Sequence, residues 1–98
     1  MLTIVNKLTV TGDRAEFERL LGEITGYMKS RPGFVSHTLY KSLKDENVLI
    51  ETGTWESREA HAAALQGPGF RDRVGLLMKH ATAEFEPCLE IPAFPAGQ

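Results

Sequence analysis

The sequence predicts an α+β fold, in which a four-stranded antiparallel sheet carries helices on one face. Four segments, at about 2–10, 34–42, 48–56 and 83–91, alternate their side chains with the period of two that is typical of strands. Between the first two segments, and again between the last two, apolar residues recur every three to four positions, as they do on amphipathic helices. The resulting order βαββαβ is that of the ferredoxin-like arrangement.

Length and composition limit the class of protein. The 98 residues suffice for one core, so we treat 1–98 as a single domain with residues 92–98 as a terminal arm. Eleven basic and thirteen acidic residues give a net charge of -2 without a dense basic cluster, which argues against a nucleic-acid partner. No stretch approaches the ~20 apolar residues that span a bilayer, and the strand pattern begins at Leu2, so we expect no membrane partner and a cytoplasmic protein.

The first strand carries one polar residue in an otherwise apolar row. Asn6 shares its face with Leu2, Ile4, Leu8 and Val10. A buried amide must find hydrogen-bond partners or destabilise the fold. Two explanations stay open: an amide satisfied by neighbouring groups, and an amide that faces a ligand.

A helix is expected over residues 14–29. Asp13 and Glu16 stand at the spacing of a capping box, which marks the start of the helix. Its apolar face comprises Phe17, Leu20, Leu21, Ile24 and Met28. Gly22 and Gly26 each weaken it by roughly 1 kcal/mol relative to Ala, and we interpret them as points of close approach to the sheet, with approach to a ligand as the alternative.

The second strand has no purely apolar face. Strict alternation places Phe34, Ser36, Thr38 and Tyr40 on one face, and Val35, His37 and Leu39 on the other. The first of these rows is typical both of the wall of a ligand-bearing cavity and of an exposed sheet face. A polar turn at 44–47 then leads into the third strand.

The only tryptophan lies at the corner between the third strand and the next helix. Trp55 shares a strand face with Glu51 and Gly53, and Ser57 is a suitable N-cap residue for the helix. A large side chain at this place can form the wall of a pocket beneath the helix or can simply fill the core.

The last third of the chain predicts a broken helix and an edge strand. The helix that follows Ser57 is interrupted by Gly-Pro-Gly at 67–69, as a kink or a movable lid, and resumes over 70–80. Pro87 lacks an N–H, which confines the last strand to a sheet edge or a bulge. Because the uncovered sheet face still carries apolar residues, we expect a homodimer formed through that face. Cys88 is alone, so no internal disulfide can form.

Three pieces of the chain resemble a known family. They are the run W-E-S-x-E-A at 55–60, the run Arg-Pro-Gly-Phe at 31–34, and Asn6 in the first strand. Together they resemble the antibiotic biosynthesis monooxygenase family of dimeric α+β barrels, and the resemblance covers nearly the whole chain. That family includes quinone-forming oxygenases and haem-degrading enzymes.

The resemblance to the quinone-forming members implies a monooxygenase that oxidises aromatic, polyketide-type substrates with O2, without metal or flavin. Asn6 and Trp55 are then the catalytic residues, and we expect them to face one hollow between sheet and helices. Glu51 stands where some members have a second Asn, and it can act as a base or pair with Arg71 or Arg73. The substrate-binding candidates are Phe34, Tyr40, Glu51, His61, Phe70, Arg71, Arg73 and Met78.

Two other functions stay open. In the haem-degrading members the axial His corresponds to a position near Arg73 or Val74, neither of which ligates iron, so His61 or His80 would have to replace it. A non-catalytic protein that binds an aromatic ligand is the second alternative. Apart from haem in the first of these, no cofactor and no metal ligand are expected.

Overall fold

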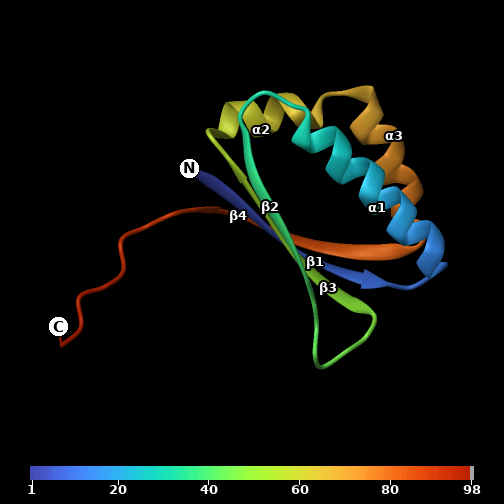
Figure 1. Ribbon diagram of the computed structural model, residues 1–98, viewed down its shortest axis with the longest axis horizontal. Helices are drawn as coiled ribbons and strands as arrows, with labels where there is room; N and C mark the ends of the chain where they lie inside the picture. Colours follow the sequence, from blue (N-terminus) through green and yellow to red (C-terminus); the bar gives the residue numbers. More distant parts are fainter. Residues whose placement is uncertain (98) are drawn as a thin grey trace.

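A computed structural model describes residues 1–97 of the chain as a sheet covered on one face by helices (Figure 1). The elements are β1 (Leu2–Val10), α1 (Arg14–Lys29), β2 (Phe34–Lys41), β3 (Val48–Trp55), α2 (Arg58–Leu65), α3 (Pro68–Leu77) and β4 (Ala81–Leu89). The strands lie in the order β2-β3-β1-β4, and all three neighbouring pairs are antiparallel. The predicted ferredoxin-like α+β fold is confirmed.

Helix α1 begins and ends where the sequence predicts. The carboxylate of Asp13 accepts a hydrogen bond from the backbone N–H of Glu16 at 2.9 Å, which caps the first turn. The predicted close approach of its two glycines to the sheet is wrong, however. A Cβ atom added at Gly22 or Gly26 would have no neighbour within 4 Å, so neither glycine marks a close approach to the sheet.

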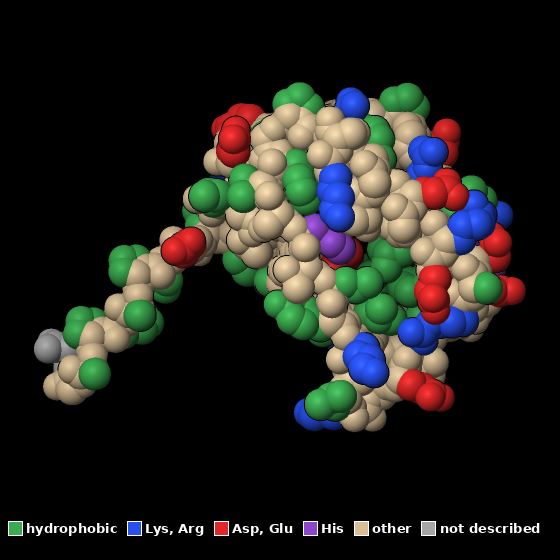
Figure 2. All heavy atoms as spheres, in the orientation of Figure 1, with side chains coloured by type: hydrophobic (Ala, Val, Ile, Leu, Met, Phe, Trp, Pro, Cys, Tyr) green, Lys and Arg blue, Asp and Glu red, His purple; other side chains and the backbone are tan. Residues whose placement is uncertain are grey.

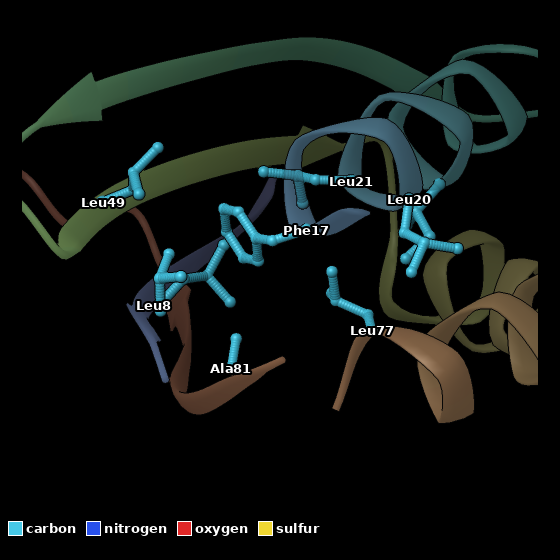
Figure 3. Close-up of a cluster of buried hydrophobic side chains, with 9 residues drawn as sticks. Leu8, Phe17, Leu20, Leu21, Leu49, Leu77 and Ala81 are labelled. Atoms are coloured by element: carbon cyan, nitrogen blue, oxygen red, sulfur yellow. The ribbon is translucent and has the colours of Figure 1, made fainter. Parts of the chain in front are cut away.

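The main core lies between α1, α3 and the sheet. Phe17 and Leu8 are its most deeply buried side chains, at 0% and 1% exposure. Figure 3 shows Phe17 pointing from α1 toward Leu8 and Leu49 of the sheet, with Ala81 of β4 near Leu8 and Leu77 approaching from α3. Each such side chain contributes about 1.5–3 kcal/mol through burial, so this cluster holds the helices against the sheet.

The start of β4 differs from the prediction. Helix α3 runs over Pro68–Leu77 instead of the expected 70–80, and β4 begins at Ala81, two residues earlier than expected. The carbonyl of His80 accepts hydrogen bonds from the backbone N–H groups of Thr11 and Gly12, at 2.8 and 3.0 Å. These bonds draw the chain into the sheet beside β1, and β4 becomes the edge strand that Pro87 requires.

Strict alternation fails in β2 because the strand contains a bulge. The register shifts between Phe34 and Ser36, so Val35 is the extra residue. Phe34 therefore lies on the helix-covered face together with His37, and Tyr40 lies on the opposite face. The predicted row from Phe34 to Tyr40 is wrong for this reason.

The junction between α2 and α3 is packed against α1. The hydroxyl of Tyr27 donates to the carbonyl of Ala64 at 3.1 Å, and a Cβ atom at Gly67 would overlap that hydroxyl. Pro68 occupies the first turn of α3, where a missing N–H costs nothing. The structure thus favours a packed kink over a movable lid.

Within residues 1–97, no helix lies over the other face of the sheet, and the arm leaves the body of the protein (Figure 1). Residues 92–97 are exposed and lie outside helices and strands, and Phe94 in the arm is 86% exposed. Among residues 1–97, no helix is long and apolar enough to cross a membrane.

Candidate active site

Four chemically distinctive side chains share the helix-covered face of the sheet. Glu51, Gly53 and Trp55 form one row of β3, since side chains alternate along a strand. In the ladders Asn6 of β1 lies opposite Glu51, and His37 of β2 lies opposite Gly53. Residues directly opposite one another point to the same face, so Asn6, Glu51, His37 and Trp55 belong to one surface.

Glu51 is held from both sides. Asn6 Nδ2 donates to Glu51 Oε1 at 3.0 Å, and His37 Nε2 is hydrogen-bonded to Glu51 Oε2 at 3.0 Å. The side chains of His37 and Glu51 are only 16% and 19% exposed. The expected pairing of Glu51 with an arginine is wrong, because Arg73 binds Glu23 at 3.1 Å and Arg71 binds Gln66 at 3.3 Å.

The amide of Asn6 is only half satisfied. Its Oδ1 atom is buried and has no hydrogen-bond partner among the residues that the structure describes. An unsatisfied buried acceptor costs about 1–3 kcal/mol. Oδ1 is therefore an unpaired acceptor beneath the helix-covered face of the sheet.

Trp55 is the buried end of this surface. The side chain is 2% exposed and makes edge-to-face contacts with Phe34 and His61, each with ring centroids 5.5 Å apart. Its Nε1 lies 3.9 Å from the point where Gly53 would carry a Cβ atom. The indole N–H therefore lies on the side of the ring that is nearest Gly53. Because glycine has no side chain, it leaves space there.

His61 comes from α2 and packs on the indole. Burial lowers the pKa of His61 from its ordinary value, because the charged imidazolium loses hydration there. The ring is consequently neutral near pH 7 and can accept a hydrogen bond.

A hollow of about 600 Å³ opens between α1 and β2. It is lined by Arg14, Phe17, Glu18, Leu21, Gly22, Thr25, Gly26, Lys29, His37, Leu39 and Leu49. Figure 2 shows an apolar depression with a histidine at its edge. The lining contains His37 but neither Asn6 nor Trp55. The expectation that Asn6 and Trp55 face one hollow is therefore wrong for this hollow: the two residues share a sheet face, but His37 is the residue of that face that lines it.

Several predicted binding residues lie elsewhere. Tyr40 is 53% exposed on the opposite face of the sheet, where it pairs with Ile50. Phe70 packs against the main core, and Met78 is a 43% exposed residue at the end of α3. Of the binding candidates, Phe34, Glu51 and His61 are those that the fold brings to Asn6 and Trp55.

His37 was absent from the predicted site although the sequence contained a signal for it. Counting back from the polar turn pairs Leu39 with Glu51 and His37 with Gly53, as the ladder has them. Counting from the turn therefore places His37 on the same face of the sheet as Glu51. Alternation counted from Phe34 places these two residues on opposite faces. The bulge at Val35 made these two counts disagree.

The histidines considered for haem differ in position. His80 lies at the far end of β1, and its Nδ1 accepts the backbone N–H of Asp13 at 3.2 Å. His61 is packed on Trp55. Within residues 1–97, no group of three or more His, Cys, Asp or Glu side chains is arranged to hold a metal ion.

Comparison with known proteins identifies the family. Residues 1–75 match the family described as antibiotic biosynthesis monooxygenase. Deoxynogalonate monooxygenase of Streptomyces nogalater is 34% identical over 83 residues, which are 85% of this chain and 70% of that relative. The chain belongs to the antibiotic biosynthesis monooxygenase family.

Solved structures agree with this assignment. SnoaB, a cofactor-independent oxygenase from Streptomyces nogalater, is 31% identical with a TM-score of 0.87 over 96% of both chains. A further antibiotic biosynthesis monooxygenase is 16% identical with a TM-score of 0.79, over 94% of this chain and 100% of the other, and supports the fold alone. The relatives confirm the predicted class, a monooxygenase without metal or flavin.

Proposed function

We propose that the protein oxidises an aromatic substrate of the phenol or anthrone type to a quinone, using O2 directly. The observation that carries this proposal is the largely apolar hollow that His37 lines, together with the hydrogen bonds that link His37 to Glu51 and Glu51 to Asn6. Its volume of about 600 Å³ lies within the usual range for small-molecule sites. The relatives support the same class of chemistry, since one is named for deoxynogalonate and another is described as cofactor-independent.

The hollow suits a flat, mostly apolar ligand. Phe17, Leu21, Leu39 and Leu49 supply apolar walls from the helix and the sheet. Charged groups lie only on α1, where Lys29 can bind a carboxylate or phenolate oxygen at the rim. An aromatic ring system with a few oxygens fits this distribution of polar and apolar groups.

The chemistry requires little beyond a bound, deprotonated substrate. Loss of a proton makes the ring system electron-rich enough to pass one electron to O2, and recombination of the two radicals forms a C–O bond in a peroxide. Protonation gives a hydroperoxide at a carbon that still carries one hydrogen. Loss of that hydrogen as a proton breaks the O–O bond, releases the outer oxygen as hydroxide, and leaves a carbonyl. The products are one quinone and one water.

Asn6 and Trp55 are the proposed contacts for substrate oxygens that reach past His37. The unpaired Oδ1 of Asn6 accepts from a hydroxyl, and the indole N–H of Trp55 donates to a developing oxyanion. A donor of this kind in an enclosed site is worth about 3 kcal/mol of transition-state stabilisation. His61 holds the indole in place from α2.

The test is oxidation of an anthrone by the purified protein in air with a chelator present, followed by quinone absorbance. Trp55→Phe keeps an aromatic ring and removes the N–H, so a rate at least tenfold lower is expected. A parent protein no faster than buffer would refute the proposal. A haemin titration separates the haem-degrading alternative, which requires a shifted Soret band and loss of haem on reduction.

We also propose that two copies associate through the uncovered face of the sheet. That face carries Val5, Ile50 and paired threonines such as Thr3 and Thr54, whose hydroxyls lie 3.1 Å apart. Sedimentation equilibrium of the parent and of Ile50→Lys tests this, since a charge at the centre of the interface should shift the mass toward the monomer.

A further inference from the structure

We propose that His37 is the general base of this site, that Glu51 positions it, and that Asn6 in turn positions Glu51. The inference rests on the proposed function and adds the group that removes the substrate proton. It also assigns a specific role to Glu51, the carboxylate at the position where some family members have a second Asn.

The geometry forms a continuous chain from the hollow into the protein. His37 lines the hollow, and its Nε2 lies 3.0 Å from Glu51 Oε2. The second oxygen of the carboxylate accepts from Asn6 Nδ2 at 3.0 Å. All three residues come from adjacent strands of one sheet, so their separations are set by the backbone ladders.

The carboxylate determines which nitrogen of His37 is available. An ionised carboxylate can only accept hydrogen bonds, so the bond to Glu51 requires a proton on Nε2. The neutral ring then carries its free lone pair on Nδ1. When Nδ1 takes a proton, the imidazolium is stabilised by the carboxylate behind it, as in other carboxylate–histidine pairs.

Asn6 limits the motion of Glu51. A carboxylate bound on one oxygen alone can rotate, whereas hydrogen bonds to both oxygens hold it in one orientation. The bond to Glu51 occupies Nδ2, while the buried Oδ1 has no hydrogen-bond partner among residues 1–97. Asn6 therefore acts here both as a positioning residue and as a candidate substrate contact.

The proton can be followed through the reaction. Nδ1 of His37 receives the proton of the bound phenol or anthrone, and the electron pair stays on the substrate. After O2 has added, the imidazolium returns this proton to the peroxide. The neutral ring is then able to take the second C–H proton, which joins the departing hydroxide as water.

A binding experiment tests the base without any turnover. The probe is 2-hydroxyanthraquinone, which is already a quinone and whose visible absorption reports ionisation of its hydroxyl. With the parent protein at a pH where the free probe is mostly protonated, binding should shift the spectrum toward the ionised form. His37→Ala should remove the shift, Glu51→Gln should reduce it, and Thr38→Ala, a neighbour on the opposite face, should leave it unchanged. Absence of a shift with the parent, or an equal shift with His37→Ala, would overturn the inference.

A second experiment measures the reaction. His37→Ala should lower the rate of anthrone oxidation by about 10²-fold or more, the usual contribution of a general base, and added imidazole should restore part of it. Glu51→Gln should lower kcat more than it raises KM and should displace the pH profile, which a merely structural residue would not do. Equal rates for His37→Ala and the parent would overturn the inference while leaving the proposed oxygenase intact. An ionising shift without any turnover of anthrone would refute the proposed oxygenase and retain the base. Thermal unfolding of each variant checks that it is folded.

Discussion

Replacing the glycines of α1 should stabilise the protein and impair the site at the same time. Gly22 and Gly26 lie in the interior of the helix, and an added Cβ atom meets nothing within 4 Å at either position. Glycine costs a helix interior roughly 0.5–1 kcal/mol relative to Ala. The free energy of unfolding should therefore rise by about 1–2 kcal/mol in Gly22→Ala/Gly26→Ala.

Both glycines also line the hollow, so a larger side chain there takes space from the ligand. Gly26→Leu keeps a strong helix former but projects four carbon atoms over the apolar wall. We expect binding of a multi-ring aromatic to weaken at least tenfold in this variant, although the fold stays stable.

Gly75→Ala in α3 is the matched control. It also has no neighbour within 4 Å of an added Cβ atom, and it does not line the hollow. Thermal denaturation should show about half the gain of the double variant, as expected for one glycine, at roughly 4–8 °C per kcal/mol for a domain of this size, with unchanged ligand binding. The reasoning fails if the α1 variants are less stable than the parent, or if Gly26→Leu binds the aromatic probe as tightly as Gly75→Ala does.

Three further predictions concern stability. Phe17→Ala should lower the free energy of unfolding by about 3–5 kcal/mol in urea denaturation, since this 0% exposed ring fills the core; a loss below 1 kcal/mol would contradict the packing described. Because burial lowers the pKa of His61, the folded state binds a proton there less readily than the unfolded state, so the free energy of unfolding should fall as the pH drops below about 6.5. His61→Phe should flatten this pH dependence. The same pH dependence in His61→Phe as in the parent would contradict the prediction. Gly67→Ala should lower the free energy of unfolding by about 1–3 kcal/mol, because the added methyl group overlaps the Tyr27 hydroxyl. In a double-mutant cycle, Tyr27→Phe should recover part of that loss. Strictly additive effects of the two substitutions would exclude the overlap as the cause.

The strand and helix patterns alone were sufficient for the fold. The alternation at 2–10 and the apolar face of 14–29 correspond to β1 and α1 residue for residue. Asp13 caps α1 as its spacing predicts. These features depend on neighbours within one turn or one strand, so they can be read locally.

Part of the candidate site could also be found in this way. Asn6 is conspicuous as the single amide in an apolar row, and Trp55 as the single indole at a strand end. Period-two alternation correctly places Glu51 on the face of Trp55. Neither pattern shows that Glu51 is hydrogen-bonded to Asn6 and His37, because these two partners lie on other strands.

The chain by itself thus determined the order of elements, the buried faces of β1 and α1, and three members of the site, Asn6, Glu51 and Trp55. Only the tertiary structure decided that His37 stands beside Glu51, since one bulged residue reverses the face of everything after Phe34. It likewise decided that the glycines of α1 border a hollow instead of touching the sheet. A register shift, or a space between a helix and a sheet, depends on how distant segments pack, and no pattern within a single segment encodes that packing.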